Sequence, residues 1–358
     1  MGDTSAPMPA RMLIPGTYDA TYTRLAGGGI TPANALGVVA EDLSIQPPAS
    51  PGQLSITIVD VISYAVTRDV TLDGAPFPLS QVETGRIVLV GEHGDEIDFG
   101  ATHEDAPTWQ VVPGRYDVYY RRQQGWTAAP GNTNARIASG YRIDGDEALS
   151  IDVQTVQLSF DFLVNGAPFP LSQLEQGRFT LVGSQPGDAI DLGETIDAAP
   201  TRRVIAGSYD VVYDWIAGSV LVPRNNDHPV LEDVSLAVDQ TLVVDVPIRT
   251  IVPTFLLDGT AFPADPTQAG EIVLRSASGG RISLGTTNIA LPDSVIGIQD
   301  DYVVEYEWVA GLDVPRNPRH RIGFTSVPEP GFAHGLALAA LWLARRRSGL
   351  RSRNAIRP

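Results

Sequence analysis

The sequence lacks two residue types on which much protein chemistry depends. Its 358 residues include no cysteine, which excludes disulfides, thiolate metal ligands and thiol nucleophiles. Every one of the 25 basic residues is arginine. The absence of lysine excludes a Walker A lysine, a Schiff-base enzyme and a Ser–Lys catalytic pair. Stability must therefore come from hydrophobic cores, and several large enzyme classes are ruled out.

Positive charge is also scarce over most of the chain. The formal net charge is −17, but residues 328–358 contain six arginines and one glutamate, so residues 1–327 carry 19 basic and 41 acidic side chains. A body with this excess of negative charge repels phosphate backbones, and we expect no nucleic-acid partner. The 35 glycines and 28 prolines favour many turns over long helices.

Motifs for catalysis or metal binding are missing as well. No HExxH or GxSxG sequence occurs, and no pair among the 41 carboxylates of residues 1–327 stands out as a glycosidase pair. The acidic stretch Asp144–Glu147 lacks the ligand order of a calcium loop and is interpreted as a solvated turn. We interpret the five histidines as exposed loop residues: His93, His103, His228, His320 and His334. We therefore expect no catalytic, cofactor-binding or metal-binding residues, no cofactor and no enzymatic activity.

What the sequence does contain is a long internal repeat. Gly74–Gly91 (GAPFPLSQVETGRIVLVG) and Gly166–Gly183 (GAPFPLSQLEQGRFTLVG) are identical at 14 of 18 positions, and a weaker copy begins at Gly259. A second marker of the type PGxYDVxY surrounds Tyr18, Tyr116, Tyr209 and Tyr302, at spacings of 98, 93 and 93 residues. A period of about 93 residues is too long for a solenoid and matches a self-contained β-sandwich.

Each copy is expected to consist of strands. In the third copy of the second marker, one phase of a period of two holds Tyr209, Val211, Tyr213 and Trp215, and the other holds Asp210, Val212, Asp214 and Ile216, as expected of a strand with one buried face. The paired tyrosines of this marker, such as Tyr209 and Tyr213, have the same parity in every copy and are predicted to face the core. About seven short strands per copy, separated by turn signals such as NG and PGD, give an all-β fold.

The strand ending in NGAPFP or DGAPFP, followed by a strand that starts at glycine and then by PGxYDVxY, resembles the carboxypeptidase-regulatory-like, prealbumin-type β-sandwich, which often occurs in tandem in exported bacterial proteins. The resemblance covers most of the chain before residue 327. It implies immunoglobulin-like β-sandwich repeats that usually perform no catalysis.

The two markers divide the chain into segments. The first contains only the tyrosine half of a repeat, and the fourth stops before its closing strands. The expected domains are a partial repeat at 1–64, whole repeats at 65–157 and 158–250, an incomplete repeat at 251–326 and a distinct segment at 327–358.

The C-terminal segment has its own composition. Val327, Pro328, Glu329 and Pro330 precede a mostly apolar run, which ends at Arg345, Arg346 and Arg347. This order resembles the PEP-CTERM sorting signal, which implies an exosortase-type processing enzyme as partner. Arginines after an apolar run stay on the cytoplasmic side, so a short C-terminal hydrophobic helix would anchor the chain transiently in the inner membrane with the repeats outside.

Two features depart from that signal. The 14 residues from Gly331 to Ala344 would span only about 21 Å as a helix, against a hydrocarbon core of about 30 Å. Residues 1–10 contain no charged segment or apolar run typical of a signal peptide. Together with the half repeat at 1–64, this suggests that upstream sequence is missing.

Two recurring motifs remain. Trp215 and Trp308 occupy equivalent positions and could form an aromatic contact for sugars, although core packing is the favoured interpretation. Both are followed by VPRN, at Val222–Asn225 and Val314–Asn317. We interpret VPRN as a turn that closes a hairpin, with an arginine contact to an anionic partner as the alternative.

The sequence thus predicts a non-enzymatic, exported protein of the cell surface or extracellular matrix, made of tandem β-sandwich modules and sorted by a PEP-CTERM-like signal. Tandem modules provide reach and multivalent contact, with a polysaccharide or surface protein as partner. The alternatives are a carbohydrate-binding accessory protein of an exopolysaccharide matrix and a fragment of a larger secreted enzyme.

Overall fold

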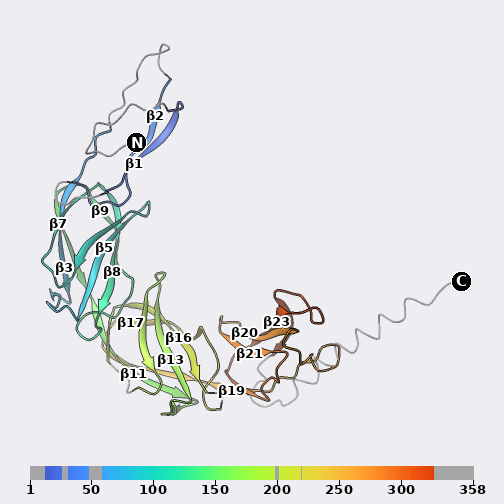
Figure 1. The fold of residues 1–358 in the computed structure, drawn as a ribbon. Coiled ribbons are helices and arrows are strands. Elements are labelled where there is room, and N and C mark those ends of the chain that lie inside the picture. The colour runs from blue at the N-terminus through green and yellow to red at the C-terminus, as the bar shows by residue number, and fades with distance from the viewer. Residues whose placement is uncertain (1–12, 26–30, 48–58, 198–200, 219, 326–358) are drawn as a thin grey trace. The chain divides into compact units, whose positions relative to one another are not determined.

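A computed structural model describes residues 13–25, 31–47, 59–197, 201–218 and 220–325. Every regular element in these ranges is a β-strand, as predicted (Figure 1). The expected C-terminal helix and its flanking motifs, including Val327–Pro330 and Arg345–Arg347, lie outside the described residues.

The strands follow the repeats along the chain. The first repeat contributes β1 (Gly16–Tyr22) and β2 (Gly37–Ile45). The strands of the second repeat are β3 (Tyr64–Leu72), β4 (Ala75–Pro76), β5 (Thr84–Gly91), β6 (Glu96–Ala101), β7 (Thr108–Val111), β8 (Gly114–Gln124), β9 (Ala135–Ile143) and β10 (Glu147–Val153).

The third repeat reproduces this order and the fourth reproduces most of it. The strands of the third are β11 (Thr155–Val164), β12 (Ala167–Pro168), β13 (Gln176–Gly183), β14 (Ala189–Glu194), β15 (Arg202–Ile205), β16 (Gly207–Ala217), β17 (His228–Leu236) and β18 (Gln240–Val246). Those of the fourth are β19 (Ile248–Ile251), β20 (Ala269–Ser276), β21 (Arg281–Thr286), β22 (Val295–Ile298), β23 (Tyr302–Ala310) and β24 (His320–Thr325).

Each sandwich has two sheets. In the second repeat one sheet has the order β6-β5-β8-β9, and the other pairs β3 with β10, β4 and β7. The β3–β10 pair is parallel, so the last strand of the repeat lies beside its first and closes the sandwich. The fourth repeat retains the sheet β21-β20-β23-β24 and the antiparallel pair β19-β22.

By its contacts the chain divides into two compact units. The first comprises residues 1–157, 183–190 and 202–207, and the second comprises 158–182, 191–201 and 208–358. The boundary therefore passes through the third repeat. The domain limits expected from the sequence stay a prediction.

The tight turns use the residues that their backbone demands. Asp73 and Gly74 have φ of 51° and 77°, Asn165 and Gly166 have 47° and 74°, and Asp258 and Gly259 have 51° and 85°. Two consecutive positive φ values define a type I′ turn, for which Asn-Gly and Asp-Gly are the preferred pairs. The NG and DG signals in the sequence mark these turns.

The marker tyrosines of the last three repeats are buried, as predicted. In the second repeat Tyr116 is 4% exposed and Tyr120 0%, and in the fourth Tyr302 is 1% and Tyr306 3%. They join the aliphatic cores of their repeats. In the first repeat, which provides only the two-stranded sheet β1-β2, Tyr18 remains 37% exposed because no second sheet covers it within the described residues.

In the last three repeats a glycine makes room for the second tyrosine of the pair. A Cβ placed on Gly85 would lie 2.3 Å from the Tyr120 ring, one on Gly177 2.2 Å from Tyr213. In the fourth repeat, a Cβ on Gly270 would lie 2.1 Å from Tyr306. Only glycine lets these rings lie flat across the neighbouring strand.

Candidate functional site

The feature that repeats most closely outside the cores is a Pro-x-Asn segment after the tyrosine strand. We call it the connector. It occurs at Pro32–Asn34, Pro130–Asn132, Pro223–Asn225 and Pro315–Asn317. The surface that receives it, which we call the socket, is the strand end four residues before the first marker tyrosine of the following repeat.

The first connector enters its socket through Asn34. The N–H of Val112 donates to Asn34 Oδ1 at 2.9 Å, and Asn34 Nδ2 donates to the Tyr116 hydroxyl at 2.9 Å and to Asp95. The N–H of Ala33 also donates to the carbonyl of Gln110 at 2.6 Å. Asn34 is completely buried, so its side-chain amide forms its hydrogen bonds with protein groups and not with solvent.

The second connector, within the first unit, repeats the asparagine contacts to a backbone N–H and to an aspartate, and the backbone bond beside them. The N–H of Ile205 donates to Asn132 Oδ1 at 2.9 Å, and Asn132 Nδ2 donates to Asp188 at 3.0 Å. The N–H of Gly131 donates to the carbonyl of Arg203 at 2.8 Å. Ile205 belongs to the apolar core cluster of the second repeat, as does Ala33 of the first connector.

The third connector, in the second unit, repeats the pattern. The N–H of Ile298 donates to Asn225 Oδ1 at 2.8 Å, Asn225 Nδ2 donates to the Tyr302 hydroxyl at 2.9 Å, and the N–H of Arg224 donates to the carbonyl of Ile296 at 2.9 Å. Asn132 and Asn225 are both fully buried. We call each connector in its socket a joint. In every joint a backbone hydrogen bond and one buried asparagine amide link two consecutive repeats.

Burial alters the acid–base behaviour of the joint. It raises the pKa of Tyr116 to about 12 and that of Tyr302 to about 12, although the asparagine hydrogen bond acts in the opposite direction in both. It also raises the pKa of Asp188, against the hydrogen bonds from Asn132 and its neighbours. The joints thus hold neutral tyrosines and are built for packing and not for proton transfer.

The second marker tyrosine of a repeat also holds the connector of the same repeat, by a hydrogen bond to its proline carbonyl. The Tyr120 hydroxyl donates to the Pro130 carbonyl at 3.0 Å, and the Tyr213 hydroxyl donates to the Pro223 carbonyl at 2.9 Å. The weaker counterpart in the first repeat joins Tyr22 to Pro32 at 3.4 Å. The glycines that accommodate these rings therefore also position the connectors.

One acidic or amide side chain holds the loop before each of the last three connectors. Glu83 accepts hydrogen bonds from the N–H groups of Thr127, Ala128 and Ala129 at 3.0 to 3.3 Å. Glu175 accepts those of Val220, Leu221 and Val222 in the third repeat. In the fourth repeat the neutral Gln268 accepts the N–H groups of Leu312 and Asp313, both at 2.8 Å.

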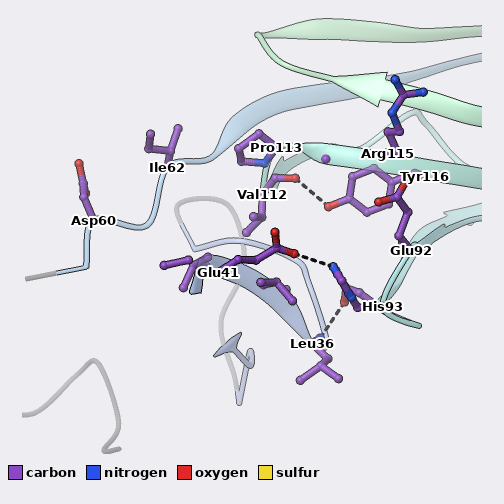
Figure 2. Close-up of a pocket in the computed structure, with 17 residues that line it drawn as sticks. Leu36, Glu41, Asp60, Ile62, Glu92, His93, Val112, Pro113, Arg115 and Tyr116 are labelled. Carbon is purple, nitrogen blue, oxygen red and sulfur yellow. Dashed lines mark hydrogen bonds and ion pairs between the residues drawn. The ribbon is translucent and has the colours of Figure 1, made fainter. Parts of the chain in front are cut away.

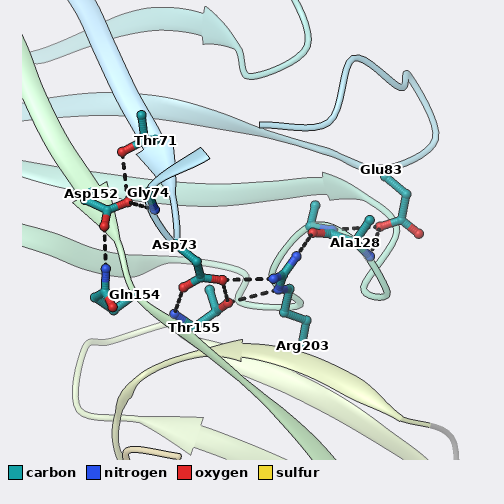
Figure 3. Close-up of polar contacts among 10 residues, drawn as sticks. Thr71, Asp73, Gly74, Glu83, Ala128, Asp152, Gln154, Thr155 and Arg203 are labelled. Atoms are coloured by element: carbon teal, nitrogen blue, oxygen red, sulfur yellow. Dashed lines mark hydrogen bonds and ion pairs between the residues drawn. The ribbon is translucent and has the colours of Figure 1, made fainter. Parts of the chain in front are cut away.

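Arg203 adds a polar clamp to the second joint (Figure 3). Its guanidinium donates to Asp73 at 2.9 Å, to the Ala128 carbonyl at 2.7 Å and to Thr155 Oγ1 at 2.9 Å. Asp73 in turn accepts the N–H of Thr155 at 2.7 Å. One arginine therefore joins the first hairpin of the second repeat to the loop that carries the connector.

A cleft of about 390 Å³ lies beside the first joint, lined by residues that include Leu36, Asp60, Arg115 and Tyr116 (Figure 2). Across it His93 Nε2 faces Glu41 Oε1 at 3.3 Å, with both side chains more than half exposed. An open, solvated ion pair of this kind contributes little and does not activate a nucleophile.

The candidate residues from the sequence lie at module surfaces. Trp308 is 39% exposed and Trp215 is half-buried, which corrects the core-packing interpretation. Their indole N–H groups donate to the carbonyls of Gly311 and Gly218. The guanidinium of Arg224 covers the Trp215 ring at 5.1 Å. A sugar-binding role for the two tryptophans stays a prediction.

Two other interpretations need correction. His228 is only 3% exposed and is no loop histidine, because it packs inside the third joint. The VPRN segment at Val222–Asn225 is a connector whose asparagine enters the next repeat, and not only a hairpin turn. The sequence does contain a signal for the connectors, since Pro-x-Asn recurs every 92 to 98 residues, at nearly the same spacing as the marker tyrosines.

Among the described residues, no group of three or more histidines and carboxylates is arranged to hold a metal ion. No helix in the described part of the chain is long and apolar enough to cross a membrane.

No protein-family model matches the chain, and no curated protein matches it. Among solved structures it is similar to the Bacillus anthracis TIE protein, with 11% identity over 73% of this chain and 48% of that one, and a TM-score of 0.20. It is also similar to a streptococcal ancillary pilin (9% identity, 73% and 96% covered, TM-score 0.19). A third similarity is to two B repeat units of the Staphylococcus aureus collagen binding protein (10% identity, 70% and 69% covered, TM-score 0.16).

The chain thus spans about half the length of the Bacillus anthracis protein. TM-scores this low carry no functional argument, and the assignment to tandem β-sandwich repeats stands on the strands and sheets described above.

Proposed function

We propose that the chain is a non-enzymatic protein of the cell surface or extracellular matrix, in which tandem β-sandwiches serve as a spacer. The observation that carries this proposal is the series of three joints. Each buries an asparagine completely and ties one repeat to the next through backbone and side-chain hydrogen bonds. A chain built only to link independent modules would use a flexible, solvated linker instead.

The surface chemistry supports an exposed location. Residues 1–327 carry 41 acidic and 19 basic side chains, and like charges keep neighbouring molecules soluble and apart. The absence of cysteine makes the fold independent of the redox state of its compartment. We propose that export ends with sorting by the PEP-CTERM-like segment, with an exosortase-type enzyme as partner.

The test is fractionation of an epitope-tagged chain in a host with and without its exosortase, the tag placed in an exposed loop of the repeats. We expect surface or medium localisation and a smaller product only in the host that has the enzyme. Substitution of Pro328, Glu329 and Pro330 by alanine should reproduce the exosortase-free result, and Asp258→Asn serves as the control. Identical size and location in both hosts would refute the sorting step.

A further inference from the structure

The fourth connector has the same backbone contact as the third, but no described residue forms a socket around it. The Asn317 carbonyl accepts the N–H of Trp308 at 2.9 Å, as the Asn225 carbonyl accepts that of Trp215 at 2.8 Å. The asparagine side chains differ sharply, because Asn225 is completely buried whereas Asn317 is exposed.

The hydroxyl of the second marker tyrosine in this repeat also lacks a hydrogen-bond partner. Tyr120 and Tyr213 donate their hydroxyl protons to the proline carbonyls of their connectors. The equivalent Tyr306 is 3% exposed, and its buried hydroxyl has no hydrogen-bond partner. A buried, unpaired hydroxyl is unfavourable, and the Tyr306 hydroxyl would gain a partner if the Pro315 carbonyl took the position that the Pro130 and Pro223 carbonyls occupy.

An open socket exists at the other end of the described residues. The Tyr18 hydroxyl donates to the Ile14 carbonyl, as Tyr116 does to Val112 at 2.7 Å and Tyr302 to Ile298 at 2.6 Å. Ile14 is 80% exposed and Tyr18 37%, so the described residues leave this socket uncovered. The described residues therefore present one exposed connector and one exposed socket.

We propose that the connector at Pro315–Asn317 docks into the Ile14–Tyr18 socket of a second copy of this chain. By the geometry of the three internal joints, Asn317 Oδ1 accepts the N–H of Ile14, Asn317 Nδ2 donates to the Tyr18 hydroxyl, and Tyr306 donates to the Pro315 carbonyl. The contact is head-to-tail, so it propagates into open chains instead of closing a dimer.

The proposed contact is weaker than an internal joint for two reasons. The first repeat supplies no counterpart of Asp95 or Asp188 for the second Nδ2 proton within the described residues. The two copies also repel each other through their acidic surfaces, a term that salt screens over about 8–10 Å at 0.1–0.15 M ionic strength. Assembly should therefore grow with protein concentration and with salt.

Sedimentation velocity of the purified full chain at increasing concentration tests the proposal. We expect species larger than the monomer for the wild type and for the control Asn226→Ala, whose described hydrogen bonds use only its backbone. Asn317→Ala removes the connector amide, and Ile14→Pro removes the socket N–H at a position already followed by Pro15. Each variant alone should weaken association at least tenfold.

Mixing the two variants separates this contact from general adhesion. An equimolar mixture retains one intact connector on Ile14→Pro and one intact socket on Asn317→Ala, so it should form dimers and nothing larger. Thermal unfolding of each variant must match the wild type. A monomeric wild type, unchanged assembly of Asn317→Ala, or a mixture without dimers would overturn the proposal, whatever the fate of the sorting signal.

Discussion

His228 fills the space that a side chain at position 280 would need: a Cβ placed on Gly280 would lie 2.1 Å from His228 Nδ1. Gly280 corresponds in the repeat to Asp188, which accepts the amide of Asn132 in the second joint. In the third joint His228 Nδ1 lies 3.3 Å from Asn225 Nδ2 and supplies the acceptor from the connector side. The acceptor of the asparagine amide therefore lies on the socket side in the second joint and on the connector side in the third. Gly280 leaves the space that the His228 imidazole occupies.

This exchange predicts a rescue. His228→Ala leaves Asn225 Nδ2 with the Tyr302 hydroxyl but without its second acceptor, and should cost about 1–3 kcal/mol of unfolding free energy. Gly280→Asp alone should clash with the imidazole. The double variant recreates the Asp188 arrangement, so we expect at least half of the summed loss to be recovered in a double-mutant cycle by urea unfolding. Strictly additive losses would contradict the exchange.

The buried His228 also predicts acid sensitivity. Burial lowers the pKa of His228, and Asp300 opposes this only in part. A base with a lowered folded pKa contributes its full stability above its unfolded pKa of about 6.5, and stability falls as the pH drops below that value. We expect the urea midpoint to decrease between pH 7 and 5, and His228→Gln to flatten this decrease. An equal slope in both proteins would exclude His228 as the cause.

Asn225 and Asn226 form a matched pair for testing the joint. Asn225→Ala removes the acceptor of Ile298 and the donor to Tyr302 inside a fully buried contact, and should cost about 1–3 kcal/mol. Asn226 is described as bonding to Arg281 only through its backbone, in both directions, so Asn226→Ala should change stability by less than about 0.5 kcal/mol. Hydrogen exchange at Ile298 provides the local measurement, and equal protection in both variants would contradict the assignment.

Gly85 should not tolerate a methyl group. A Cβ at this position would lie 2.3 Å from the Tyr120 ring, and the ring cannot retreat without giving up its bond to Pro130. We expect Gly85→Ala to cost at least about 1–3 kcal/mol through overpacking. At Gly145 an added Cβ meets nothing within 4 Å, which makes Gly145→Ala the control in thermal unfolding.

Glu83 predicts a second pH effect of known sign. Although burial raises its pKa, the N–H groups of Ala129, Ala128 and Thr127 together lower it below the usual value. An acid with a lowered folded pKa contributes stability above its unfolded pKa, and this contribution is lost as the pH falls toward the folded pKa. Glu83→Gln should keep the fold, because Gln268 performs the same task in the fourth repeat, and should remove that acid-dependent loss. Urea unfolding curves from pH 5 to 3 measure this loss in both proteins, and an equal loss of stability in Glu83→Gln and the wild type would contradict the prediction.

Much of the architecture could be predicted from local pattern. The period-two alternation around Tyr209 and Tyr213, the NG and DG turns and the copied GAPFP segments led directly to all-β repeats, because these signals act over a few residues. The role of the joint could not be predicted in this way. Pro-x-Asn is ordinary turn chemistry within one repeat, and its asparagine acquires partners only when Val112, Ile205 or Ile298 of the next repeat arrives.

By itself the sequence determined the strand content, the repeat length and the buried faces, since periodicity and turn residues depend on neighbours along the chain. The tertiary structure alone decided that His228 is buried, that Trp308 is exposed and that three asparagines seal the joints while Asn317 does not. These outcomes depend on contacts across some 50 to 80 residues of chain, where the pairing of distant backbones sets the surroundings of each side chain.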